Sequence, residues 1–177
     1  MKIAFAGASS TGKTTLAKAI EGKLQLKYIN VDSRKIIDDL NHSNIDTLNK
    51  QEFIEFQKIW LNEKLENEKS INNFITDRTY IDAIAYMLNR NINNFELFDN
   101  YIKKMDVYDF IFYLPIGRIP FFDDGYRSKD EKSNKNIDNL IIELLEKNTI
   151  RYHKVIIHDF ESSLEFILDI VGKPNEK

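Results

Sequence analysis

Eight residues close to the N-terminus restrict the fold more than any other part of the sequence. Residues 7–14 read Gly-Ala-Ser-Ser-Thr-Gly-Lys-Thr and fit the pattern G-x-x-x-x-G-K-[ST]. Such a loop wraps successive backbone N–H groups around a phosphate, and glycine is needed where a Cβ would clash or where φ is positive. An apolar run, Lys2–Ala6, precedes the loop, and a helical pattern, Lys13–Leu26, follows it. This strand–loop–helix unit predicts a triphosphate-binding loop.

Strand-like and helical patterns alternate along the rest of the chain. The expected strands are Lys2–Ala6, Tyr28–Val31, Phe74–Thr76, Phe110–Leu114 and Lys154–Ile157. The expected helices are Lys13–Leu26, Asn49–Lys69, Thr79–Leu88, a helix through Ile137 and Leu145, and Ser162–Val171. This alternation predicts an α/β fold of three layers, with a parallel sheet between two layers of helices.

No repeat or linker divides the 177 residues, so we expect a single domain over residues 1–177. Residues 116–136 fit neither the strand nor the helix period. They are polar and contain Gly117, Pro120 and Gly125, which predicts a long loop that acts as a lid.

The composition excludes several classes of protein. The chain has no cysteine, which excludes disulfide scaffolds, thiolate metal sites and cysteine nucleophiles. Its net charge of −3 argues against a dedicated nucleic-acid-binding protein. No apolar run reaches the roughly 18 residues that span a bilayer, and Lys2–Ala6 is too short for a signal peptide. We therefore expect a cytoplasmic protein without a membrane partner.

The phosphate loop predicts nucleotide binding, and the residues after the third expected strand indicate the reaction. Motor ATPases place Asp-Glu at this point, whereas this chain has Asp77-Arg78. An aspartate at the carboxyl end of a strand is well placed to support Mg²⁺, and arginine in place of glutamate removes the usual hydrolytic base. The pair favours phosphoryl transfer over hydrolysis. The alternative is a helix N-cap at Asp77 with a surface arginine.

Further polar residues are candidates for an acceptor site. Asp32 follows the second expected strand and is either the base that accepts a hydroxyl proton or a helix N-cap. Arg118 and Arg127 lie in the expected lid, where a cation can close over the transferring phosphate; the alternative is a solvated loop. Gln57 lies on a helix among aromatic residues and borders either the acceptor or the core.

These motifs together resemble a family of small P-loop kinases and ATPases that includes the nicotinamide riboside kinase domain of NadR. The similarity covers the first loop, Asp32 and Arg34 after the second strand, Gln57, the stretch Asp77–Tyr86, and Asp124–Arg127. Asp77-Arg78 is also similar to the Asp-Arg motif of thymidylate kinases and, more loosely, to the Glu-Arg-Ser motif of deoxynucleoside kinases. The resemblance implies the strand order 2-3-1-4-5.

The predicted activity is transfer of the γ-phosphoryl group of ATP, with Mg²⁺, to a nucleoside or nucleoside monophosphate. The alternatives are a nicotinamide riboside kinase and an ATPase or nucleotide-binding regulator without a small-molecule acceptor; a homodimer is left open. The predicted catalytic residues are Lys13, Asp32, Asp77 and Arg127, and the predicted metal ligands are Thr14 and Asp77. The triphosphate is assigned to Gly7, Ser9, Ser10, Thr11, Gly12, Lys13, Thr14 and Thr15, and the acceptor to Asp32, Arg34, Gln57, Arg78 and Arg118.

Overall fold

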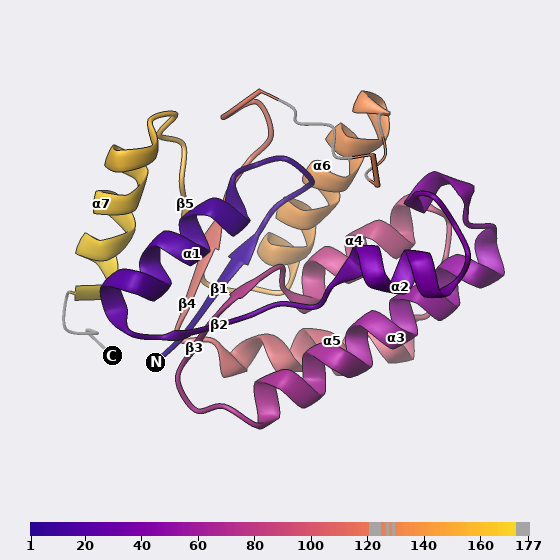
Figure 1. The fold of residues 1–177 in the computed structure, drawn as a ribbon, viewed down its shortest axis with the longest axis horizontal. Coiled ribbons are helices and arrows are strands. Elements are labelled where there is room, and N and C mark those ends of the chain that lie inside the picture. Colours follow the sequence, from indigo (N-terminus) through magenta and orange to yellow (C-terminus); the bar gives the residue numbers. More distant parts are fainter. Residues whose placement is uncertain (121–124, 127, 129, 173–177) are drawn as a thin grey trace.

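The computed structural model of the protein describes residues 1–120, 125, 126, 128 and 130–172. A five-stranded parallel sheet forms its centre (Figure 1). Its strands are β1 (Lys2–Ala6), β2 (Lys27–Ile29), β3 (Phe74–Asp77), β4 (Phe110–Tyr113) and β5 (His153–Lys154). They lie in the order β2-β3-β1-β4-β5. The predicted fold class and strand order are confirmed.

Helices cover both faces of the sheet, as Figure 1 shows. On one face lie α1 (Lys13–Leu24) and α7 (Phe160–Gly172). The other face carries α3 (Lys50–Lys69), α4 (Tyr80–Asn89) and α6 (Glu131–Lys147), together with α2 (Ser33–Asp39) and α5 (Phe95–Ile102). Two 3₁₀ helices, η1 (Ile45–Thr47) and η2 (Lys103–Val107), complete the described elements.

The central strand shows why the core has two halves. Successive side chains of a strand point to opposite faces, so β1 contributes to both. Ile3 and Phe5 pack with the apolar residues of α1 and α7. Ala4 and Ala6 pack with those of α3, α4 and α6, where their small size makes room for large aromatic side chains. None of the helices among the described residues is both long and apolar enough to cross a bilayer.

Most predicted boundaries shift by one or two residues, and β2, β5 and α6 are the differences that matter for the site and the lid. β2 ends at Ile29, and β5 covers His153–Lys154, before most of the expected Lys154–Ile157 run. Helix α6 begins at Glu131, so residues 131–136 belong to a helix and not to the expected lid loop. The cause is the N-cap: the Asp130 carboxylate accepts hydrogen bonds from the backbone N–H groups of Lys132 and Ser133. The first turn of α6 is polar: Glu131 and Lys132 are exposed, whereas Asn134 is buried.

Candidate active site

The phosphate loop connects β1 to α1, at the carboxyl edge of the sheet. Both of its glycines have positive φ, +147° at Gly7 and +88° at Gly12. A Cβ on Gly7 would lie 2.4 Å from the carbonyl oxygen of Leu114, a backbone atom of the segment after β4. The close approach of these two chain segments therefore requires glycine at position 7.

This geometry gives a testable prediction for Gly7→Ala. The methyl group meets a backbone oxygen that cannot rotate away, so we expect the free energy of unfolding to fall by roughly 2–4 kcal/mol, together with weaker ATP binding. Gly22→Ala is the matched control. Gly22 lies within α1 with nothing within 4 Å of an added Cβ. This change should stabilise the protein by about 0.5–1 kcal/mol. Urea unfolding of both variants tests the prediction, and equal stability of the two would contradict it.

Lys13 lies at the start of α1 and is buried beneath the loop. Its ammonium donates to the carbonyl oxygens of Gly7 (2.8 Å) and Ala8 (2.6 Å) and to Thr11 Oγ1 (3.2 Å). The positive charge is therefore fixed on the inner side of the loop, next to the backbone that would surround a phosphate. Ser9, Ser10, Thr11, Gly12, Thr14 and Thr15 line the same cavity of about 230 Å³ as Lys13.

Asp82 on α4 is hydrogen-bonded to the phosphate loop. Its buried carboxylate accepts the backbone N–H of Gly7 (2.9 Å), and its other oxygen accepts the N–H (2.8 Å) and hydroxyl (2.6 Å) of Thr79. The sequence analysis assigned Asp82 no role of its own. The signal was present, because Thr79-x-x-Asp82 has the spacing of a helix capping box, and this box is formed at the N-terminus of α4.

Thr14 and Asp77 form the pair that was predicted to support Mg²⁺. The Thr14 hydroxyl donates to one oxygen of the Asp77 carboxylate. The other oxygen, Oδ1, is buried and has no hydrogen-bond partner among the described residues. A buried carboxylate oxygen in this position fits a hard cation such as Mg²⁺, which prefers oxygen ligands. The neighbouring Tyr28 hydroxyl is also buried without a partner in the described part of the chain. Burial, and then the Asp77 carboxylate, raise the pKa of Tyr28.

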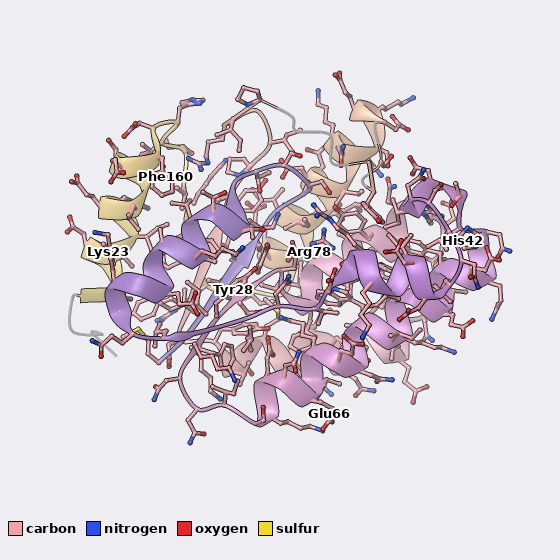
Figure 2. The ribbon with its side chains drawn as sticks, in the orientation of Figure 1. Lys23, Tyr28, His42, Glu66, Arg78 and Phe160 are labelled. Carbon is pink, nitrogen blue, oxygen red and sulfur yellow. The ribbon has the colours of Figure 1, made fainter. Side chains whose placement is uncertain are left out.

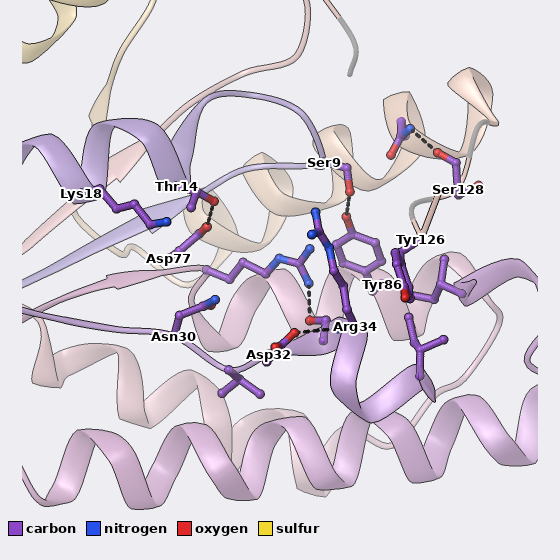
Figure 3. Close-up of a pocket in the computed structure, with 16 residues that line it drawn as sticks. Ser9, Thr14, Lys18, Asn30, Asp32, Arg34, Asp77, Tyr86, Tyr126 and Ser128 are labelled. Atoms are coloured by element: carbon purple, nitrogen blue, oxygen red, sulfur yellow. Dashed lines mark hydrogen bonds between the residues drawn. The ribbon is translucent and has the colours of Figure 1, made fainter. Parts of the chain in front are cut away.

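A second cavity, of about 390 Å³, opens beside the phosphate loop (Figure 3). Its wall brings together residues that are far apart in the sequence. Ser9 and Thr14 come from the loop and α1, Asn30 and Asp32 follow β2, Asp77 and Arg78 end β3, and Tyr86 lies on α4. Arg34, Lys18, Tyr126 and Ser128 also contribute. The structure thus brings Asp32, Arg34, Asp77 and Arg78 to one cavity.

Asp32 has both of the properties that the sequence analysis weighed. Its carboxylate caps α2 by accepting the backbone N–H groups of Arg34 (3.1 Å) and Lys35 (3.3 Å). Both hydrogen bonds involve the same oxygen, Oδ1, and the residue is exposed to the cavity. The cap therefore fixes the carboxylate at the cavity wall. The guanidinium of Arg34 lies 5.6 Å from the ring centre of Tyr126, and both residues line the cavity.

Arg78 has an unusual backbone conformation for a residue with a side chain. Its φ is +71°, in the left-handed region, which costs about 1–2 kcal/mol outside glycine. Its guanidinium lies 5.6 Å from the ring centre of Tyr86 and donates to Ser33 Oγ at 3.5 Å. Figure 2 shows Arg78 in the interior near the strand ends, whereas Lys23, Glu66 and Phe160 lie at the periphery. The turn after β3 therefore directs this arginine toward the cavity.

Tyr86 links the wall of the larger cavity to the phosphate loop. Its hydroxyl and the Ser9 hydroxyl of the phosphate loop are 2.8 Å apart, as the dashed line in Figure 3 shows. Its ring packs against the guanidinium of Arg78. Sequence analysis gave this tyrosine no function, because nothing in a helical pattern identifies which aromatic residue faces a site 77 positions away.

Two predicted acceptor residues, Gln57 and Arg118, do not line the cavity of about 390 Å³. Gln57 is buried on α3 and does not line the cavity. Arg118 is buried beside the phosphate loop: its Nη1 donates to the carbonyl of Ile157 and to Ser163 Oγ (2.8 Å), and its Nη2 would lie 3.2 Å from a Cβ added to Gly12. It does not line the cavity of about 390 Å³, because its side chain extends toward α7. Arg127 lies outside the described residues.

Several solved structures are similar to this chain over nearly its whole length. Deoxyadenosine kinase from M. mycoides with bound dATP superimposes with a TM-score of 0.72 at 19% identity, covering 98% of this chain and 100% of that one. Thymidylate kinase from Candida albicans gives 0.70 at 18% identity, covering 97% and 90%. NadR protein in complex with NR gives 0.69 at 18% identity, covering 99% of this chain but 53% of NadR. The chain thus has the fold of these kinases.

No curated protein matches the sequence. A family model described as an AAA domain matches residues 2–162, which is most of the chain and includes the phosphate loop, Asp32, Asp77 and Asp82. The chain belongs to this AAA-domain family.

Proposed function

We propose that the protein is an ATP-dependent kinase that transfers the γ-phosphoryl group to a nucleoside or nucleoside monophosphate. One observation carries the proposal. The phosphate-loop cavity of about 230 Å³ and the adjoining cavity of about 390 Å³ share the wall residues Ser9, Thr14, Asp77 and Arg78. A triphosphate in the first cavity and an acceptor in the second would meet at this shared wall, and phosphoryl transfer depends mainly on such positioning and on charge stabilisation.

ATP, the acceptor and the side chains of the two cavities account for every bond and proton in the proposed reaction. An acceptor oxygen forms a bond to the γ-phosphorus while the bond from that phosphorus to the β,γ-bridging oxygen breaks, and ADP leaves with the electron pair. When the acceptor is a hydroxyl, its proton passes to the Asp32 carboxylate; when the acceptor is a phosphate, no proton needs removal at neutral pH. Lys13 and Arg78 would stabilise the negative charge on the transferred group.

Thr14 and Asp77 would hold Mg²⁺ when ATP is bound. The ion supplies neutralisation of charge on the phosphate oxygens. The unpartnered Asp77 Oδ1 and the Thr14 hydroxyl are the oxygen ligands available beside the loop.

The cavity wall supports an acceptor with a sugar and a planar base. Asp32, Asn30 and Ser33 offer hydrogen-bonding groups, Arg34 and Arg78 offer guanidinium groups, and Val31, Ile37 and Ile45 offer apolar surface. Sugar hydroxyls, phosphate oxygens and a base face match these three kinds of surface. The solved structures with the same fold include kinases named for deoxyadenosine and thymidylate, which is consistent with this class of acceptor.

A transfer screen tests the proposal and identifies the acceptor. Purified protein is incubated with Mg²⁺ and ATP labelled at the γ-phosphate, together with deoxyadenosine, thymidine, their 5′-monophosphates or nicotinamide riboside. We expect label in at least one organic product. Transfer to nicotinamide riboside alone would assign the first alternative function, and phosphate release that no acceptor changes would assign the ATPase or regulator.

A further inference from the structure

A charged pair lies buried beneath the carboxyl end of β3, outside both cavities that hold substrates in the proposed function. It consists of Lys64 and Glu68 on α3, whose side chains are 3% and 4% exposed and whose charged atoms are 2.6 Å apart. Their spacing of four residues on a helix is usual for solvent-exposed pairs. Burial of both charges is expensive and requires that every hydrogen bond of the pair be satisfied.

The carboxylate of Glu68 is fixed by two tyrosines. Oε1 accepts from the Tyr108 hydroxyl at 2.8 Å, and Oε2 accepts from the Tyr80 hydroxyl at 2.6 Å. The rings of Trp60, Tyr80 and Tyr108 surround the Lys64 ammonium, with centres 5.3–5.8 Å away. Burial lowers the pKa of Lys64, and the Glu68 carboxylate opposes this change. The pair is thus a rigid anchor for the ammonium group.

The remaining donors of this ammonium point at the end of β3. Lys64 Nζ donates to Thr76 Oγ1 at 3.1 Å and to the carbonyl oxygen of Arg78 at 2.8 Å. These two residues flank Asp77, and Arg78 is the residue with φ of +71°. The buried anchor is therefore bonded directly to the backbone of the one cavity residue that has the left-handed conformation after β3.

We infer that Lys64 is a positioning residue that acts through Arg78. Its bond to the Arg78 carbonyl holds the turn in the left-handed conformation and so aims the guanidinium at the shared wall of the two cavities. Without this bond, the turn can relax to a more ordinary conformation, and the guanidinium then leaves its place above Tyr86. The inference rests on the proposed function, because its effect is on transfer.

The test is a double-mutant cycle between the anchor and Arg78. Lys64→Met together with Glu68→Gln removes both charges and preserves side-chain volume. The glutamine amide can accept from one tyrosine hydroxyl through its oxygen and donate to the other through its NH₂ group. We expect kcat/KM for transfer to fall on the order of 10- to 100-fold, measured with whichever of deoxyadenosine, thymidine 5′-monophosphate and nicotinamide riboside is phosphorylated fastest. In an Arg78→Ala background, the same double substitution should change kcat/KM by less than about twofold.

A matched control lies on the same helix. Glu66 and Lys69 form an exposed pair 2.8 Å apart, with side chains 74% and 66% exposed, and Glu66 is at the periphery in Figure 2. Glu66→Gln with Lys69→Met makes the same chemical change on the surface and should leave transfer unchanged. Urea unfolding of all variants measures their stability. A change in kcat/KM without a change in the free energy of unfolding then reports on positioning and not on loss of the fold.

Each outcome has a distinct meaning. A wild-type protein that transfers no phosphoryl group contradicts the proposed function itself. Wild-type kinetics in the Lys64→Met/Glu68→Gln variant, or a loss that persists undiminished in the Arg78→Ala background, overturns the inference about Lys64 and leaves the function intact. If this variant does not fold, Glu68→Gln alone keeps the ammonium but weakens its anchor. It should then give a smaller loss that is also absent when Arg78 is alanine.

Discussion

Replacing Lys13 by alanine should lower phosphoryl transfer on the order of 10³-fold, the effect expected when one fixed charge donor is removed from a transferring group. The ammonium is held inside the phosphate loop by the carbonyl oxygens of Gly7 and Ala8. Arg78 also lines this cavity, but its guanidinium lies against Tyr86 and donates to Ser33, so it does not replace the ammonium inside the loop. The measurement is the rate of label transfer from γ-labelled ATP to the fastest acceptor.

Lys23→Ala is the control for this variant. Lys23 lies in the last turn of the same helix, is exposed, and is at the periphery in Figure 2. It should retain full transfer. Circular dichroism should show the same helix content for both variants as for the wild type. Substantial transfer by a folded Lys13→Ala variant would contradict the role of the phosphate loop.

Asp77→Asn should produce the second largest effect, a loss of transfer of roughly 10²-fold or more. The substitution preserves size but removes the negative charge that would hold a divalent cation with Thr14. The affinity for Mn²⁺, used as a paramagnetic substitute for Mg²⁺, should fall about tenfold or more in the presence of ADP. Electron paramagnetic resonance of free Mn²⁺ measures this affinity directly and independently of turnover.

Asp169→Asn is the corresponding control, because Asp169 is exposed on α7 and distant in sequence from every residue that lines the two cavities. It should bind Mn²⁺ as the wild type does. Unchanged Mn²⁺ affinity in the Asp77→Asn variant would contradict the assignment of Asp77 as a metal ligand, whatever happens to the rate of transfer.

Most of the fold could be predicted from the sequence because its signals are local. Runs such as Lys2–Ala6 and Phe110–Leu114 are apolar without alternation, as expected for strands that are buried on both faces. Helices α1, α3 and α4 follow apolar spacing and begin within one residue of the predicted positions. The short helix α5 was not predicted. The start of α6 was missed because its first turn is polar, and only the Asp130 cap marks it.

One part of the candidate site could be predicted from the sequence and the other could not. The phosphate loop is one continuous segment, so its residues could be named from the sequence. The cavity beside it depends on tertiary contacts: Asp82 reaches Gly7 across 75 positions, and Tyr86 reaches Ser9 across 77. Arg118 combines the two cases. Its place in a glycine-containing loop suggested a cation near the phosphates, and its buried guanidinium does lie beside Gly12, but its hydrogen bond to Ser163 at the start of α7 could not be predicted.

Lys64 illustrates why a local pattern can mislead. Two charged residues four positions apart on a polar helix are typical of a solvated face. The pair is buried because α3 packs against α4 and because two tyrosines supply the hydrogen bonds that the carboxylate needs. These tyrosines come from α4 and from the residue that follows η2, and no feature of the sequence around position 64 indicates them.

The central claim is that the γ-phosphoryl group of ATP passes to an organic acceptor in the cavity beside the loop. One reaction tests it most directly: wild-type protein, Mg²⁺, γ-labelled ATP and the best acceptor, with label counted separately in the organic product and in inorganic phosphate. We predict that most label enters the organic product and that Asp32→Ala lowers this share. Label found entirely in inorganic phosphate, at a rate that is independent of every acceptor, would contradict it.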